Sequence, residues 1–170
     1  MVTHIRSCNQ NGLKMSESEH KCQVLMSHMM LPTNANPDGH IHGGDIMKYI
    51  DDAAGVVAMK HARTTVVTAS IDRLDFHLPV HIGNLLILKA SLNSTGRTSM
   101  EIGVRVEAED LKKGIVTHIA SAYLTFVALD DSKHPTPVPV YQPSNPKAIR
   151  RRKQAQERKA CYYQSKNLDD

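Results

Sequence analysis

The sequence has no tryptophan, and aromatic residues make up only 4% of its 170 residues. It also has no apolar run of about 20 residues, the length that a membrane-spanning helix needs. The N-terminus does not show the charged, apolar and small-residue regions of a secretory signal. We therefore expect one globular domain in the cytoplasm with no membrane partner.

Cysteine is scarce and has no pattern. Cys8, Cys22 and Cys161 are odd in number and do not have metal-ligand spacing, so we expect free thiols in a reducing compartment. His40 and His42 lie two residues apart, but a zinc site needs further ligands at suitable spacing, and none is evident. The sequence also lacks Gly-x-Ser-x-Gly, the motif of one large class of serine hydrolases. We expect no metal site.

Positive charge is in modest excess, with a net charge of +4. Much of the excess lies in the run from Lys147 to Lys159, and such a run can attract nucleic acid, an acidic membrane or a phosphorylated ligand. Because aromatic residues do not alternate with these cations, a stacking platform for single-stranded nucleic acid is not favoured. We expect no nucleic-acid partner and a solvated basic surface.

The most informative stretch runs from Asn34 to Gly55. It opens with Asn, Pro, Asp and Gly residues, which favour a turn. From Gly43 to about His61 the apolar residues then recur at steps of three and four, which predicts a helix with one buried face. The residues of that face are Ile46, Met47, Ile50, Ala53, Ala54 and Val57. Gly55 lies within it, so a strand can pass close to the helix.

The start and the middle of this helix suggest two halves of a site. Gly43 and Gly44 leave backbone N–H groups open at the positive end of the helix, where they can stabilise an oxyanion. Asp51 borders the apolar face about two turns later, roughly 10 Å along the axis. A single small carbonyl cannot reach both ends of that span. If both groups act on one substrate, the second must come from another copy, so we expect a homodimer with shared sites.

The remaining periodicity predicts strands. We expect them at residues 21–31, 66–76, 85–92, 100–108 and 115–128, with the helix after the first. Short connections imply antiparallel neighbours, so the helix should cover one face of a single curved sheet, an α+β fold. We expect residues 1–20 to be disordered, 21–130 to form the domain, and 131–170 to hold a proline-rich segment and an exposed basic helix over 145–160.

Several ordered motifs resemble one family. Gly39-His-Ile-His-Gly-Gly44 and Met47-Lys-Tyr-Ile-Asp-Asp-Ala-Ala-Gly55 are similar to the signature of the hot-dog-fold acyl-CoA hydrolases, in the single-domain bacterial form. The similarity continues through Val66–Phe76, Pro79–Gly83 and Gly96–Ile102, and covers roughly residues 21 to 155. It implies a curved antiparallel sheet wrapped around one long central helix. It also implies hydrolysis of acyl-CoA by a trimer of dimers, with coenzyme A present only as part of the substrate and no other cofactor.

The resemblance assigns roles to particular residues. Asp51 corresponds to the family's catalytic aspartate, a general base or a nucleophile, whereas Asp52 falls at a variable position. His40 stands where many relatives have Asn or Asp, and its role as a donor, proton shuttle or bystander stays open. His42 is expected to pack at the turn, with Gly43 and Gly44 as backbone donors.

Two further stretches are candidates for substrate binding. By resemblance, Thr68, Ala69 and Ser70 line the pantetheine arm. The segment Gly96, Arg97, Thr98 and Ser99 is either an ordinary hairpin turn or a wall of the CoA channel, in which Arg97 can pair with a phosphate. For Asn36 we favour a turn over a substrate contact. Contact of Arg150, Arg151 or Arg152 with the nucleotide is not favoured.

Two other functions remain open. A hot-dog dehydratase would use the same fold on a hydroxyacyl thioester. A non-enzymatic acyl-CoA-binding regulator would carry a DNA-binding domain, and no helix-turn-helix segment precedes Lys21.

Overall fold

The computed structural model of the protein describes residues 22–166, so the expected disorder of residues 1–20 lies outside the described part. Its strands are β1 (Gln23–Met29), β2 (Thr65–Phe76), β3 (Leu85–Thr95), β4 (Ser99–Asp110) and β5 (Ile115–Leu129). Its helices are the short 3-10 turn η1 (Pro32–Asn34), α2 (Gly43–Ala62) and α3 (Pro146–Lys166). No helix within these residues is long and apolar enough to cross a membrane.

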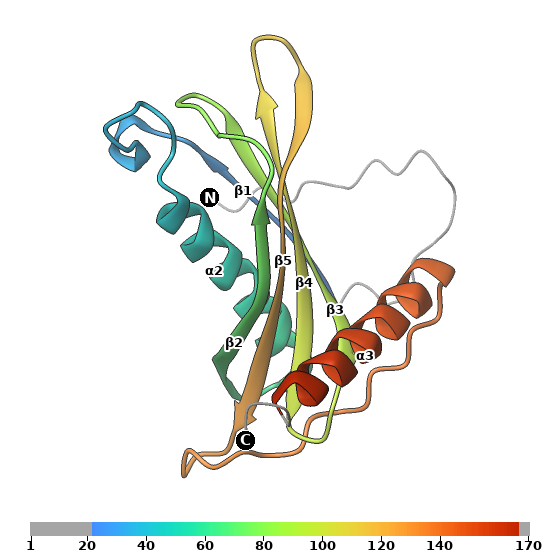
Figure 1. The fold of residues 1–170 in the computed structure, drawn as a ribbon. Helices are drawn as coiled ribbons and strands as arrows, with labels where there is room; N and C mark the ends of the chain where they lie inside the picture. The colour runs from blue at the N-terminus through green and yellow to red at the C-terminus, as the bar shows by residue number, and fades with distance from the viewer. Residues whose placement is uncertain (1–21, 167–170) are drawn as a thin grey trace.

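The strands form one antiparallel sheet in the order β1-β3-β4-β5-β2. Figure 1 shows the twisted sheet with α2 across one face and α3 against the other. The predicted α+β fold, a curved sheet around one long helix, is therefore confirmed.

One prediction about neighbouring strands is wrong. β2 and β3 are separated by only residues 77–84, yet they are not neighbours, because β2 pairs with β5 and β3 pairs with β1. The connection runs from the edge strand β2 across the sheet to β3, which lies beside the other edge strand, β1. The long strand β5 pairs with β4 on one side and with β2 on the other, and the sheet curves around α2.

Helix α2 is the centre of the core. Its buried residues are Ile46, Ile50, Ala53, Ala54, Val57 and Ala58. Ile50 is 1% exposed, and burying a side chain of this size contributes about 1.5–3 kcal/mol. Met47, expected on the buried face, is exposed instead and shares a helix flank with Asp51. At Gly55 the Phe126 ring lies at ordinary contact distance, since an added Cβ would be 3.7 Å from its Cε1.

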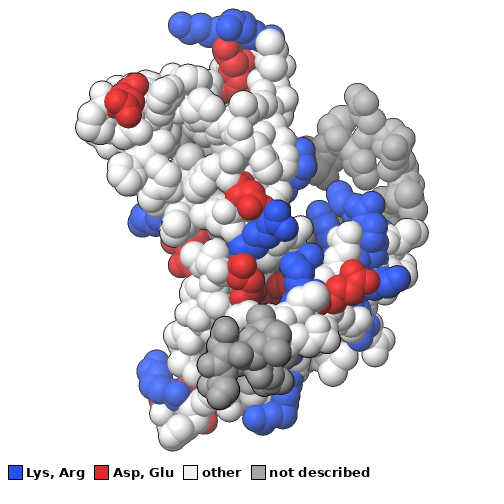
Figure 2. Space-filling model, viewed as in Figure 1, with Lys and Arg blue, Asp and Glu red and all other residues white. Residues whose placement is uncertain are grey.

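The two faces of the sheet differ in character. Toward α2 the strands present apolar side chains such as Leu88, Ile102 and Leu124, all fully buried. The opposite face is polar, and among the described side chains α3 buries Ala148 and Ala155 where it covers this face. The helix predicted over 145–160 therefore forms, but it lies against the sheet. Lys and Arg side chains gather over α3 and the strands beside it (Figure 2).

Candidate active site

The turn before α2 is built by Asn36. Its Oδ1 accepts hydrogen bonds from the backbone N–H of Asp38 at 3.1 Å and of His40 at 3.0 Å. These bonds confirm the predicted turn. The turn leads directly into α2, in which His42 is the N-cap residue.

The first two glycines of α2 differ in their hydrogen bonding. The Gly44 N–H donates to Nδ1 of His42 at 3.0 Å. Within the described residues, the Gly43 N–H makes no recorded hydrogen bond. The Gly44 amide is thus already used by the helix cap, and Gly43 is the donor left to polarise a carbonyl.

His40 lies beside the helix start with another histidine. It forms an isolated bridge with His81, and the two ring centroids are 5.1 Å apart. Asp45, close by, accepts a hydrogen bond from Nδ2 of Asn34 at 2.9 Å. Among residues 22–166, no group of three or more His, Cys, Asp or Glu side chains is placed to hold a metal ion.

Asp51 and Asp52 have different surroundings. Oδ1 of Asp51 accepts a hydrogen bond from Oγ1 of Thr68 at 2.7 Å, and the Asp51 side chain is half-buried. Asp52 is exposed and lies 3.9 Å from Nζ of Lys48, an ordinary surface pair on one helix. Only Asp51 is therefore held by a second element of the fold.

A single chain does not bring Asp51 to the helix start. α2 is continuous from Gly43 to Ala62, so Asp51 lies about two turns from Gly43. Asp51 instead points toward β2, an edge strand whose second edge is unpaired within the described chain. Val67 and Ile71 on β2 are 43% and 41% exposed. An exposed apolar edge of this kind is suited to pairing with another strand.

Some of the predicted substrate-binding residues meet in a groove of about 330 Å³ between the β3–β4 hairpin and α3. Ser70, Gly96, Thr98 and Ser99 line it. Thr68 and Ala69 do not line it. Ala69 is one of the two residues, with Asp72, that the β2–β5 register skips, and it follows Thr68, which contacts Asp51. Arg97 is exposed and also lies outside the groove.

The groove contains residues that sequence reasoning missed. Asp72 accepts hydrogen bonds from Oγ of Ser70 at 2.6 Å and Oγ1 of Thr125 at 2.8 Å. Arg158 of α3 pairs with Glu101 of β4, and its guanidinium lies 3.8 Å from the centre of the Tyr123 ring. The Ser70-x-Asp72 spacing was visible in the sequence. The contribution of α3 was not, because it depends on how the helix crosses the sheet.

The long helix α2 wrapped by one curved antiparallel sheet is the arrangement of a hot-dog domain. Residues 38–115 match the thioesterase superfamily. The chain is 37% identical over 159 residues to Protein VdlD of Helicobacter pylori, covering 93% of this chain and 91% of that protein. It belongs to the thioesterase superfamily and, within it, to the hot-dog acyl-CoA hydrolases.

Solved structures support the same classification. A hexameric acyl-CoA thioesterase, solved in its apo form, matches with a TM-score of 0.85 and 38% identity, covering 88% of this chain and 96% of that one. An acyl-CoA hydrolase from Staphylococcus aureus, solved with butyryl coenzyme A, coenzyme A and coenzyme A disulfide, matches with a TM-score of 0.79 and 33% identity. That match covers 88% of this chain and 94% of the hydrolase.

Proposed function

We propose that this acyl-CoA thioester hydrolase assembles each active site from two protomers, with the Gly43 amide of one and Asp51 of the other. The observation that carries the proposal is the hydrogen bond from Thr68 to Asp51, 2.7 Å long, beside the unpaired edge of β2. It holds the carboxylate at a surface that a second copy can cover. The exposed Met47, one turn before Asp51, extends the same surface.

Hydrolysis of the thioester at this site can follow either of two mechanisms. In the first, Asp51 removes a proton from water, and the resulting hydroxide attacks the thioester carbonyl. The oxyanion that forms is stabilised by the Gly43 N–H and the positive end of α2. The C–S bond then breaks, and the CoA thiolate takes up the proton. In the second, Asp51 itself attacks the carbonyl, and the C–S bond breaks as the CoA thiolate leaves, which forms a mixed anhydride. Water then hydrolyses the anhydride and restores the Asp51 carboxylate, and one proton of the water passes to the thiolate. Both yield a free carboxylic acid and CoA.

The Staphylococcus aureus hydrolase also has solved structures of variants in which an aspartate, an asparagine and a threonine are each replaced by alanine. This chain carries the same three residue types at the proposed site, in Asp51, Asn36 and Thr68. That parallel supports a role for Asn36 in shaping the Gly43 end, through the turn that it closes. His40 lies on this turn beside His81 and is proposed to act as a hydrogen-bond donor to substrate or water.

The groove of about 330 Å³ between the β3–β4 hairpin and α3 is proposed to receive part of the CoA moiety. Ser70, Gly96, Thr98 and Ser99 line it, and backbone and hydroxyl groups of this kind can bind the pantetheine amides. Coenzyme A enters as substrate, and the proposed chemistry needs no other cofactor. The proposed location is a reducing cytoplasm, where a thiol such as that of the exposed Cys161 stays reduced.

The direct test is Asp51→Asn. It removes the ionised carboxylate and keeps the side-chain shape, so we expect acyl-CoA turnover to fall at least about a hundredfold, the usual scale for loss of a general base. A thiol-release assay with short, medium and long acyl-CoAs measures it. The matched control is Asp52→Asn, one residue away, which should retain wild-type turnover. Equal activity of Asp51→Asn and wild type would reject the assignment.

A mixing experiment tests the sharing of sites. Gly43→Pro removes the backbone N–H that is proposed to polarise the carbonyl. The helix should tolerate this change, because proline is favoured at the first helical position and the preceding residue, His42, has an extended backbone. Gly43→Ala keeps the N–H, and its Cβ meets only Phe76 at 3.8 Å, so it serves as the control.

Dimers that combine Gly43→Pro with Asp51→Asn contain one intact and one doubly altered site if sites are shared. Random mixing should then restore about a quarter of wild-type turnover, because half the dimers are mixed. If each protomer held a complete site, the mixture would stay as inactive as its parents.

Two rival functions have their own assays. A dehydratase would hydrate enoyl-CoA and release no thiol. A regulator would bind acyl-CoA and shift DNA on a gel with no turnover. Either pattern would replace the proposal.

A further inference from the structure

The polar face of the sheet beneath α3 has a floor of small residues. Ser91 of β3 pairs with Gly103 of β4, and Ser121 of β5 lies beside Arg105. A Cβ at Gly103 would come within 2.6 Å of Nδ2 of Asn93, so only glycine leaves this floor open. Two cavities of about 200 Å³ and 500 Å³ lie here, and they share Lys89, Ser91, Arg105 and Arg151. We call them together the α3 groove.

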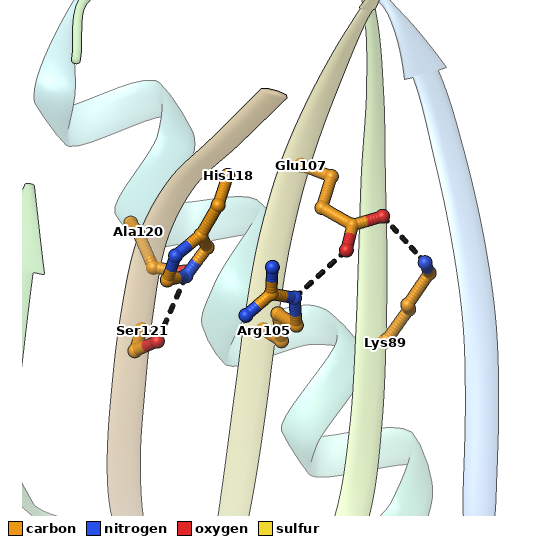
Figure 3. A network of polar contacts seen from close by, with 6 residues as sticks. All are labelled: Lys89, Arg105, Glu107, His118, Ala120 and Ser121. Atoms are coloured by element: carbon orange, nitrogen blue, oxygen red, sulfur yellow. Dashed lines mark hydrogen bonds and ion pairs between the residues drawn. The ribbon is translucent and has the colours of Figure 1, made fainter. Parts of the chain in front are cut away.

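Positive charge dominates the α3 groove. Its cations are Lys89, Arg105, Lys147, Arg150, Arg151 and Arg158. Arg158 is paired with Glu101. One further carboxylate, Glu107, lies between Lys89 and Arg105 (Figure 3) and accepts from Nε of Arg105 at 2.7 Å. Burial opposes its charge, yet hydrogen bonds from Arg105 and Lys89 hold the pKa of Glu107 below its ordinary value. The charge of Glu107 is thus already matched.

The cations on the first turns of α3 are not matched. Within residues 22–166, no ion pair is recorded for Lys147, Arg150 or Arg151. The pKa of Lys147 is lowered, first by Arg151 and then by burial, with Arg150, Lys89 and Arg105 adding to the repulsion. Burial likewise lowers the pKa of Arg151. Like charges held this close destabilise the fold unless an anion lies among them.

A buried amide in the same groove also lacks a partner. Asn93 is 2% exposed, and its Nδ2 donates to Glu101 at 2.9 Å. Its Oδ1 has no hydrogen-bond partner in the described structure, and Asn93 lines the smaller of the two cavities. An unpaired buried carbonyl costs free energy, so such groups usually mark a place where a donor binds.

We propose that the α3 groove binds the phosphate groups of a small, multiply phosphorylated ligand. Guanidinium groups match phosphate oxygens two at a time, and the ammonium groups of Lys89 and Lys147 add point charge. The Asn93 carbonyl accepts a hydrogen bond from an N–H or O–H group of the same ligand. The phosphates belong either to a free phosphoanion or to the nucleotide end of coenzyme A. The proposal concerns binding and does not depend on the hydrolytic mechanism.

Calorimetric titration of the purified full chain with inorganic pyrophosphate tests the proposal. The variant is Lys147→Gln with Arg150→Gln, two exposed residues whose replacement leaves the core untouched. We expect its affinity to fall at least about tenfold, the factor that 1.4 kcal/mol produces. The matched control, Lys112→Gln with Lys153→Gln, removes equal charge from exposed positions outside the groove and should bind like wild type.

Parallel titrations with coenzyme A and with pantetheine, which has no phosphate, identify the molecule that supplies the phosphates. If coenzyme A displaces pyrophosphate and the groove variant weakens both, the nucleotide end of the substrate occupies the groove. If both ligands bind together, the ligand is a free phosphoanion. The proposal is overturned if neither pyrophosphate nor coenzyme A binds saturably, or if the control loses as much affinity as the groove variant. It is also overturned if the groove variant changes the oligomeric state and leaves binding unchanged, since the cations then serve contacts between subunits.

Discussion

At the scale of single residues, the difference between two adjacent carboxylates comes from one hydroxyl group. Asp51 and Asp52 have the same chemistry and successive positions on α2. Thr68 of β2 donates to Asp51, while Asp52 faces Lys48 in solvent. The hydrogen bond ties Oδ1 of Asp51 to β2 at 2.7 Å. Thr68 is therefore expected to act as a positioning residue through Asp51.

We expect Thr68→Val to lower kcat by about tenfold to a hundredfold, with little change in KM, because the isosteric side chain removes only the donor. Thr68→Ser keeps the hydroxyl and should restore most of the rate. Steady-state kinetics with a single acyl-CoA measures both. A rise in KM at constant kcat would show that Thr68 binds substrate and does not position Asp51.

At the scale of elements, the β3–β4 pair carries an ion cluster beneath α3. Glu107 is buried between Lys89 and Arg105, which are both half exposed. Its lowered pKa means that the folded state favours the charged carboxylate. The cluster therefore stabilises the fold above the unfolded-state pKa of Glu, and this contribution is lost as the pH falls through the lower, folded-state pKa.

Glu107→Gln should reduce the free energy of unfolding by about 1–2 kcal/mol at pH 7, less than for a fully buried pair because both cations meet solvent. As the pH falls below the ordinary pKa of Glu and through the lower folded-state pKa, the wild-type carboxylate becomes protonated, and the difference should shrink. Urea unfolding between pH 7 and pH 3 measures it. Glu157→Gln, an exposed change on α3, is the control and should be neutral. A difference that does not change with pH would mean that Glu107 acts through packing.

At the scale of the whole molecule, the sheet ends at the edge strand β2, which is suited to pairing with a second copy of the chain. β2 is an edge strand with exposed Val67 and Ile71, and Asp51 lies beside it. A charge placed on such an edge blocks pairing, since a lysine cannot be buried between strands without a partner. Dimerisation and catalysis should therefore fail together.

Ile71→Lys is expected to give monomers by light scattering and to lose at least about a hundredfold in turnover, as when the catalytic base is removed. Ile115→Lys places the same charge at an exposed position on the far hairpin and should leave both assembly and turnover intact. A monomeric Ile71→Lys that hydrolyses acyl-CoA at the wild-type rate would show that one chain holds a complete site.

The local periodicity of apolar residues is sufficient to place the central helix and the strands along the chain. The steps of three and four along α2 and the alternation along β4 follow from helix and strand geometry, so their positions could be read from the sequence. Helix α2 begins at Gly43, as the sequence predicts, because Gly43 and Gly44 lie at the boundary itself. Strand ends were less certain: β3 continues past Leu92 to Thr95 through an irregularity in its register.

Sequence pattern alone is enough to identify an α+β domain with one buried helix, a glycine-rich helix start and a carboxylate about two turns later. These features depend on neighbours in the chain, which periodicity records. The strand order, the position of Arg97 outside the groove lined by Ser70 and the polar floor under α3 follow instead from tertiary packing. Each of these depends on residues far apart in the chain packing together, and a local pattern shows which face is apolar but not what that face meets.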